Sequence, residues 1–130
     1  MGFKLAKMDV GLTPPIEYMA IKSGETIALG EALVISSAGL TKCGATARPD
    51  YVAVGVVTDD GKAPVVKVQD YMLFETTLAA APGDSATLAE GEKVTLHTDG
   101  LQVTSTKTSG VATIVYLEGT AVGSTVRVRF

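Results

Sequence analysis

The side chains that could do chemistry in this chain are few and lie apart in the sequence. His97 is the single histidine and Cys43 the single cysteine among 130 residues. A histidine can act as a general base or bind zinc, and a cysteine beside a histidine can act as a nucleophile. Apart from Asp99, no further ligand stands at metal-binding spacing from His97, and Cys43 has no nearby histidine. We therefore expect His97 to be a surface residue beside a turn, and Cys43 to be a buried, unreactive thiol.

Two pairs of acidic residues are the other candidates. They are Asp59 with Asp60, and Glu90 with Glu92. Two carboxyl groups can serve as acid and base when their environments separate their pKa values. Both pairs stand beside glycine, in sequence typical of solvated β-turns, and no glycine-rich phosphate-binding motif is present. The sequence thus predicts no catalytic residue, no cofactor and no metal site, and we expect a protein that is not an enzyme.

The elements that hold these residues are expected to be β-strands. The chain has 14 glycines, which separate short runs rich in valine and threonine, a composition typical of strands and turns. Its length is that of one domain. We predict an all-β fold, a small single-domain β-barrel or β-sandwich with Gly-rich hairpins, over residues 16–130.

Turn signals define the expected strands. The run Tyr51 to Thr58 is apolar on both faces, which predicts the most buried strand, and Gly55 inside it indicates a bulge or a close backbone approach. A single helical turn is expected at Ser85 to Ala89. The other predicted strands are Ile16 to Lys22, Ala32 to Ser36, Leu40 to Cys43, a strand opened by Pro64, Tyr71 to Leu78, Lys93 to His97, Leu101 to Ser105, Val111 to Leu117 and Thr125 to Phe130.

The first fifteen residues predict an extended N-terminal arm, residues 1–15. They mix lysine with apolar residues, contain Gly2 and Gly11, and end at Pro14 and Pro15. Proline disfavours a helix before it and stiffens the junction. We expect this arm to be loosely held in the free protein and to lie against a partner.

Two stretches of the chain share one cadence, which we interpret as a degenerate duplication of a β unit. The alternative is that Gly-rich turns recur by chance in an all-β chain. The matches are Gly24, Glu25, Leu29 and Glu31 with Gly83, Asp84, Leu88 and Glu90, all 59 positions apart, Gly39-Leu40 with Gly100-Leu101, 61 apart, and Glu17-Tyr18-Met19 with Asp70-Tyr71-Met72, 53 apart. The change from 59 to 61 predicts a two-residue insertion in the second copy.

Composition predicts the kind of partner. The chain is 46% hydrophobic and 19% charged, with a mean hydropathy of +0.30, so little polar surface is left to cover a monomer. This favours a homo-oligomer or a partner-covered surface. The net charge of −3 without a basic cluster argues against nucleic acid. The apolar runs are too short to span a membrane, and we expect synthesis in the cytoplasm.

Three stretches of the chain form a recognisable series. They are the cadence Gly-Glu-x-Ile-x-x-Gly-Glu-x-Leu-Val at Gly24 to Val34, the hairpin at Ala38 to Lys42 and the strand Val52 to Val57. In this series the chain resembles the head decoration, or capsid cement, proteins of tailed bacteriophages. The resemblance covers roughly Ile16 to Leu117. Such proteins are non-enzymatic, β-rich and commonly trimeric. The resemblance implies a structural role on the outer surface of the virion capsid, with the major capsid protein as partner.

The residues expected to contact the capsid come from the two ends of the chain. They are Phe3, Lys4, Leu5, Pro14 and Pro15 of the arm, with Arg127 and Arg129 on one face of the last strand. An equally good interpretation of the two arginines is that their charges keep an edge strand from pairing with another chain and aggregating.

Three other classes of protein were weighed. A carbohydrate- or protein-binding β module of a virion appendage is the main alternative, but an aromatic platform is hard to build with four Tyr, three Phe and no Trp. A biotinyl or lipoyl carrier domain would present a lysine at a hairpin tip, where Lys22 and Lys42 do not lie. An enzyme would need a constellation of His, Cys or Ser that is missing.

Overall fold

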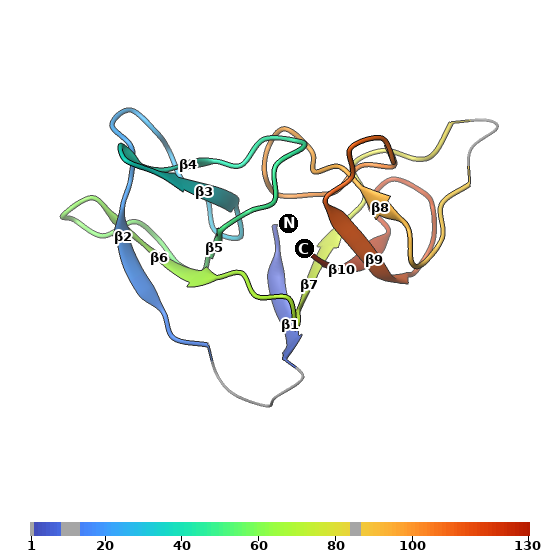
Figure 1. The fold of residues 1–130 in the computed structure, drawn as a ribbon, viewed down its shortest axis with the longest axis horizontal. Helices are drawn as coiled ribbons and strands as arrows, with labels where there is room; N and C mark the ends of the chain where they lie inside the picture. The colour runs from blue at the N-terminus through green and yellow to red at the C-terminus, as the bar shows by residue number, and fades with distance from the viewer. Residues whose placement is uncertain (1, 9–13, 84–86) are drawn as a thin grey trace.

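The computed structural model describes residues 2–8, 14–83 and 87–130. These residues form ten β-strands and contain no helix, which confirms the all-β class (Figure 1). The helical turn predicted at Ser85 to Ala89 lies partly outside the described residues. The strands are β1 (Lys4–Met8), β2 (Glu17–Ala20), β3 (Ala32–Ser36), β4 (Gly39–Lys42), β5 (Tyr51–Ala53), β6 (Lys62–Lys67), β7 (Met72–Thr77), β8 (Lys93–Val94), β9 (Ala112–Leu117) and β10 (Thr125–Arg129).

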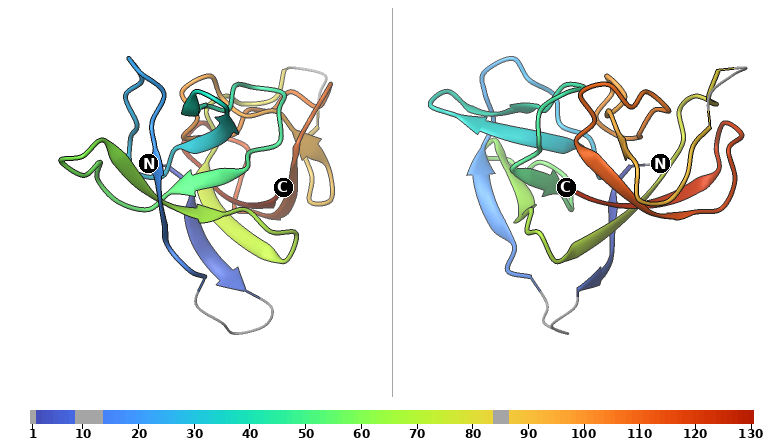
Figure 2. Two further views of the ribbon diagram at one scale, coloured as in Figure 1. Left: turned by 60° about the vertical axis from the view of Figure 1, so that its left-hand side comes forward. Right: turned by 45° about the vertical axis from the view of Figure 1, so that its right-hand side comes forward.

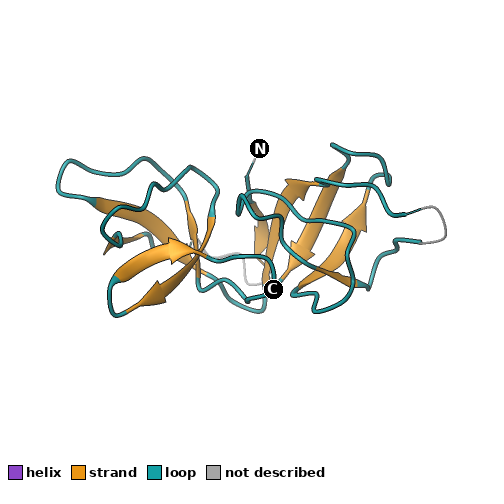
Figure 3. Ribbon diagram, turned by 90° about the horizontal axis from the view of Figure 1, so that it is seen from above, coloured by secondary structure: helices purple, strands orange, loops and turns teal. Residues whose placement is uncertain are grey.

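The strands form two antiparallel sheets. The order is β2-β6-β5-β3-β4 in one, called here the β2 sheet, and β1-β7-β10-β9-β8 in the other, the β7 sheet. The two sheets lie side by side along the molecule (Figures 1 and 3). The larger hydrophobic cluster contains Phe74 and Ile114 of the β7 sheet together with Val52 and Val66 of the β2 sheet. Because one cluster includes both sheets, the chain forms a small single domain.

The β3–β4 hairpin confirms the turn predicted at Ala38-Gly39. Leu33 pairs with Lys42 and Ser36 pairs with Gly39. The backbone of Gly39 has φ +118°, and a Cβ there would lie 2.7 Å from the backbone nitrogen of Lys22. Glycine is required at this corner because any side chain would collide with the end of β2.

The strand predicted from Tyr51 to Thr58 is wrong beyond Ala53. Val54 donates its N–H to the Pro64 oxygen at 2.9 Å, but Pro64 has no N–H to return, so the ladder ends there. The close approach predicted at Gly55 is correct, because a Cβ there would lie 2.8 Å from the Pro64 ring. The chain then leaves the sheet, and Val56 is 83% exposed.

The predicted loose arm is wrong for residues 2–8. β1 pairs antiparallel with β7, with Lys4 opposite Glu75, and Phe3 is 3% exposed. The Phe3 ring meets the Phe130 ring edge-on at 5.4 Å. Phe3 and Leu5 alternate with exposed Lys4, which is the two-residue period of a strand with one buried face. The rest of the predicted arm up to residue 13 lies outside the described residues.

Hydrogen bonds in the two sheets repeat at a constant spacing, as a duplication requires. Gly30 and Gly91 are 61 residues apart, and both have positive φ. Each donates its backbone N–H to a neighbouring strand, Gly30 to β5 and Gly91 to β9. The repeated bonds are Gly30 N to Ala53 O and Gly91 N to Ile114 O, both 2.8 Å; Ala53 N to Glu31 O and Ile114 N to Glu92 O, 3.0 and 2.9 Å; Asp50 N to Leu33 O and Val111 N to Val94 O, 2.8 and 3.0 Å; and Ala28 N to Glu31 Oε1 and Ala89 N to Glu92 Oε1, 3.1 and 2.8 Å.

The sheet orders repeat as well. β2, β6, β5 and β3 occupy the places that β7, β10, β9 and β8 occupy in the other sheet. The parallel bridge Ile21–Leu40 has its counterpart in Leu78–Val103. β1 is an addition to the second unit, because no described strand holds the equivalent place beside β2.

The repeat corrects the spacing predicted from the sequence. Glu31 corresponds to Glu92 and not to Glu90, and the two-residue insertion lies in the second hairpin loop, since Leu96 pairs with Val103 where Ile35 pairs with Leu40. The Tyr-Met triplets do not correspond, because the bridges align Ile21 with Leu78, 57 residues on. Tyr18 therefore corresponds to Glu75.

Candidate binding surface

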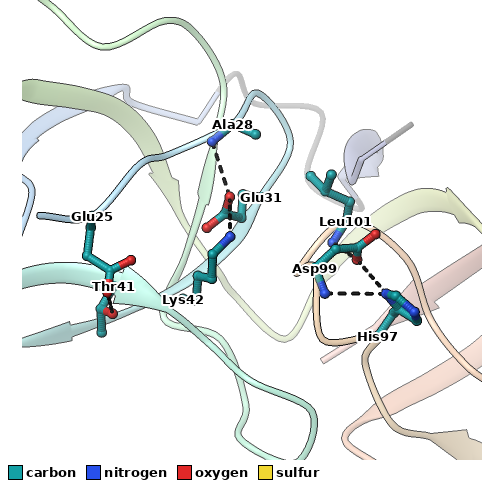
Figure 4. A network of polar contacts seen from close by, with 8 residues as sticks. All are labelled: Glu25, Ala28, Glu31, Thr41, Lys42, His97, Asp99 and Leu101. Carbon is teal, nitrogen blue, oxygen red and sulfur yellow. Dashed lines mark hydrogen bonds and ion pairs between the residues drawn. The ribbon is translucent and has the colours of Figure 1, made fainter.

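His97 and Asp99 lie together in a turn, as the sequence predicted (Figure 4). His97 Nδ1 is 3.1 Å from an Asp99 carboxylate oxygen. The same carboxylate accepts a hydrogen bond from the Leu101 N–H at 2.8 Å. Within the described part of the chain, no three residues of His, Cys, Asp or Glu gather where they could hold a metal ion. The pair stabilises the turn.

Cys43 is buried and donates its thiol hydrogen to the Ala47 oxygen at 3.0 Å. Burial, together with the nearby charge of Asp50, raises the pKa of the thiol to about 11. A thiol with such a pKa is protonated at neutral pH and is a poor nucleophile. The expected unreactive cysteine fits this geometry.

The paired acids serve local structure. Asp60 bonds to the Thr58 hydroxyl in the predicted turn, and this bond lowers the pKa of the carboxyl. Glu92 accepts the Ala89 N–H at 2.8 Å and pairs with Lys107, and the bond to Lys107 lowers its pKa. These contacts account for Asp60 and Glu92 as residues that hold their local turns.

Glu31 joins the two units of the repeat. Its side chain is buried, and one oxygen accepts from Ala28 N at 3.1 Å and from Lys42 Nζ at 3.4 Å (Figure 4). The turn of the second unit packs against it, because a Cβ on Gly100 would lie 3.0 Å from Glu31 Cγ and Ala32 N donates to the Gly100 oxygen. This contact fixes how the two sheets sit against each other.

Of the seven residues predicted to contact a capsid, three line one groove. Lys4 and Leu5, with the edge of Phe3, form one side, and Leu29, Gly30, Ala53 and Val54 form the other, around a volume of about 330 Å³. The groove runs between β1 and the β2 sheet. The Phe3 side chain is buried in the hydrophobic core, so its main role is to stabilise the fold.

The other four predicted residues lie outside this groove lining. Arg127 is exposed, but its Nε is 2.9 Å from Glu75 and its guanidinium lies over the Tyr116 ring at 5.5 Å. Arg129 is half-buried. Pro15 is exposed and Pro14 half-buried, just before β2. Arg127 is thus paired within the sheet, and its contact with a capsid stays a prediction.

The surface that the sequence missed is apolar and belongs to the first unit. Two exposed residues, Tyr18 and Leu29, stand where the second unit has Glu75 and Glu90, and Val57 is exposed as well. Ile16, Val54 and Val56 are exposed on the same elements. We call these six residues the apolar surface. The correct alignment of the repeat would have pointed to it, because only then do Tyr18 and Leu29 correspond to glutamates in the other copy.

No protein-family model, no curated protein and no solved structure matches the chain. In the portion of the chain that the structure covers, no helix is long and apolar enough to cross a membrane.

Proposed function

We propose that this protein is a non-catalytic decoration protein, which binds the outer surface of an assembled phage head through the major capsid protein and stabilises the shell. The observation that carries a binding role is the asymmetry of the repeat. One fold is used twice, and one copy keeps glutamates at positions where the other exposes Tyr18 and Leu29. Exposed apolar residues cost solubility, so their concentration in one copy favours a partner there.

The identity of the partner comes from the resemblance to decoration proteins. The cadence from Gly24 to Val34 and the hairpin from Ala38 to Lys42 carry that resemblance, and they form the Gly30-Glu31 turn and the β3–β4 hairpin. Both elements belong to the unit with the apolar surface. Leu29 of the apolar surface lies within the cadence itself, so the stretch that supports the family also contributes to the surface that supports binding.

Attachment to a shell makes weak contacts effective. If each copy touches two neighbouring subunits, the second contact forms at a high effective concentration. A ligand that binds only the assembled state also stabilises that state by mass action. The homo-oligomer expected from composition would multiply the contacts further.

The test is cosedimentation of the protein with mature and with immature shells from the same source. Tyr18→Glu and Leu29→Glu introduce the residue that the second unit already carries at the same place, so both variants should fold. We expect each to reduce occupancy of the shell by about tenfold or more. Val122→Glu, an exposed residue of the β9–β10 loop in the other unit, is the matched control and should bind as the unmodified protein does. Failure of the unmodified protein to bind either shell would refute the proposal.

A further inference from the structure

The outer edge of β2 has an equivalent in the second unit that is already occupied. In the β7 sheet, the corresponding edge of β7 carries β1, with Lys4 opposite Glu75 and Met8 opposite Met72. The repeat places Tyr18 at Glu75 and Ile16 at Leu73. In the β2 sheet, β2 is the outermost described strand, and no described residue pairs with Ile16 to Tyr18 on the outer side (Figures 1 and 2).

Burial differs at these equivalent positions. Leu73 lies between β1 and β10 and is 7% exposed, whereas Ile16 is 55% exposed and Tyr18 is 60% exposed. Both units place an apolar side chain at this point of the edge, but only the second unit covers it. An apolar edge of this kind is a ready site for another strand.

The backbone of β2 presents its hydrogen-bonding groups to the open side at Tyr18. Tyr18 pairs with Pro64, and Pro64 has no N–H, while its oxygen accepts from Val54 on the β5 side. The Tyr18–Pro64 pair therefore exchanges no hydrogen bonds, and the Tyr18 N–H and C=O point away from β6 because bonding alternates along an antiparallel strand. Closer to the end of β2 the edge is closed, since Ile21 bridges to Leu40.

We propose that the β2 edge at residues 15–18 binds an extended segment of a partner protein as an added antiparallel strand, with apolar side chains and a basic residue opposite Glu17. β1 is the template, because it occupies the equivalent edge and alternates lysine with apolar residues. Glu17 is exposed and stands where the second unit has buried Phe74, so a lysine opposite it is favoured over the Leu5 that β1 places opposite Phe74.

A second copy of this chain fits the edge less well. Antiparallel pairing of two β2 strands about Glu17 would set two glutamates directly opposite each other, which is destabilising. Pairing about Tyr18 would require Ala20, whose oxygen lies close to Gly39. The occupant is thus a different, more basic segment.

The test uses the sequence of β1 as the probe. A capped peptide Gly-Phe-Lys-Leu-Ala-Lys-Met is titrated into the ¹⁵N-labelled full chain, and a second peptide has lysine in place of the leucine. We expect saturable shifts of the Ile16 to Met19 amides, and binding of the second peptide that is about threefold tighter at low salt. Adding salt should remove that preference.

Two controls separate edge pairing from other binding. Tyr18→Pro removes a backbone N–H that does not bond to β6, and it should weaken binding of the peptide by at least about tenfold. Should this variant fold poorly, peptides with N-methylated backbone amides test the same bonds on the unmodified protein, and they should not bind. Val122→Glu should leave the titration unchanged.

Each other outcome contradicts the proposal. Shifts confined to β7 would show exchange with β1, no shift at millimolar peptide would show a closed edge, and concentration-dependent shifts without peptide would assign the edge to a second copy. The inference does not require that the partner be a capsid. If the protein binds the peptide but not the shell, only the proposed function is refuted. If it binds the shell but not the peptide, only the proposed strand addition at the β2 edge is refuted.

Discussion

The clearest consequence of the structure concerns Phe3, which lies in a segment that resembles a loose arm in sequence. Its ring is 3% exposed and packs edge-on against Phe130, and its N–H donates to the Gly30 oxygen at 2.8 Å. Replacing a buried phenylalanine by alanine removes its apolar contacts and leaves a cavity, which costs about 3–5 kcal/mol. At this chain length each kcal/mol lowers Tm by roughly 4 °C, so Phe3→Ala should lower Tm by roughly 10–20 °C.

The assay is urea unfolding followed by circular dichroism, with Lys4→Ala as the control. Lys4 is the exposed neighbour on the same strand, and its replacement should change the free energy of unfolding by less than about 0.5 kcal/mol. A loss below about 1 kcal/mol in Phe3→Ala, or equal losses in the two variants, would refute the packing of residues 2–8 and restore the loose arm.

Three further predictions follow from the turns and the titrating groups. Gly39→Ala should cost more than about 2 kcal/mol, because its Cβ would meet backbone at 2.7 Å, whereas Gly24→Ala, with φ +86° and open space around it, should cost only about 1 kcal/mol; equal losses in urea unfolding would contradict the contact. Cys43, whose pKa is raised to about 11, should react with a thiol reagent at about pH 8 only after unfolding, and prompt labelling of the native protein would contradict its burial. Because the bond to Lys107 lowers the pKa of Glu92, its contribution to stability is full at neutral pH and is lost as pH falls through the lowered pKa, so Glu92→Gln should lower the urea midpoint at about pH 7 and by less as the pH falls toward about 3; an equal effect at both pH values would contradict the pairing.

The hairpins were predictable because their signals are local. Gly39 follows a short β-branched run, and Asp99-Gly100 stands between two apolar segments, so turn chemistry alone located both corners. β10 was predictable for a similar reason, since Val126 and Val128 alternate with charged residues and are both buried.

What the sequence did not reveal depended on contacts across the sheets. Pro64 ends the β5 ladder from the neighbouring strand, which no inspection of residues 51–58 alone could show. β1 has the strand period, but Gly2 and the lysines made residues 2–8 resemble a tail until the partner strand β7 was known. The duplication was visible, but its spacing was misjudged by two residues because Glu90 and Glu92 both match Glu31 locally.

The candidate surface was hidden for the same reason. Tyr18 and Leu29 are ordinary strand and turn residues when each is considered alone. They become informative only when the pairing of the strands and the hydrogen bonds align the two units and show glutamate at both equivalent positions. The predicted contact residues were chosen from the chain ends, where Arg127 proved to be paired within the sheet.

The most direct test of the proposed function is the resistance of purified shells to heat, measured with and without the protein at saturating concentration. A protein that binds only the assembled shell must raise its disruption temperature, and the rise should grow with the concentration of free protein. The account predicts that rise for the unmodified protein and for Val122→Glu, and a much smaller one for Leu29→Glu. An unchanged disruption temperature at full occupancy would contradict a stabilising role.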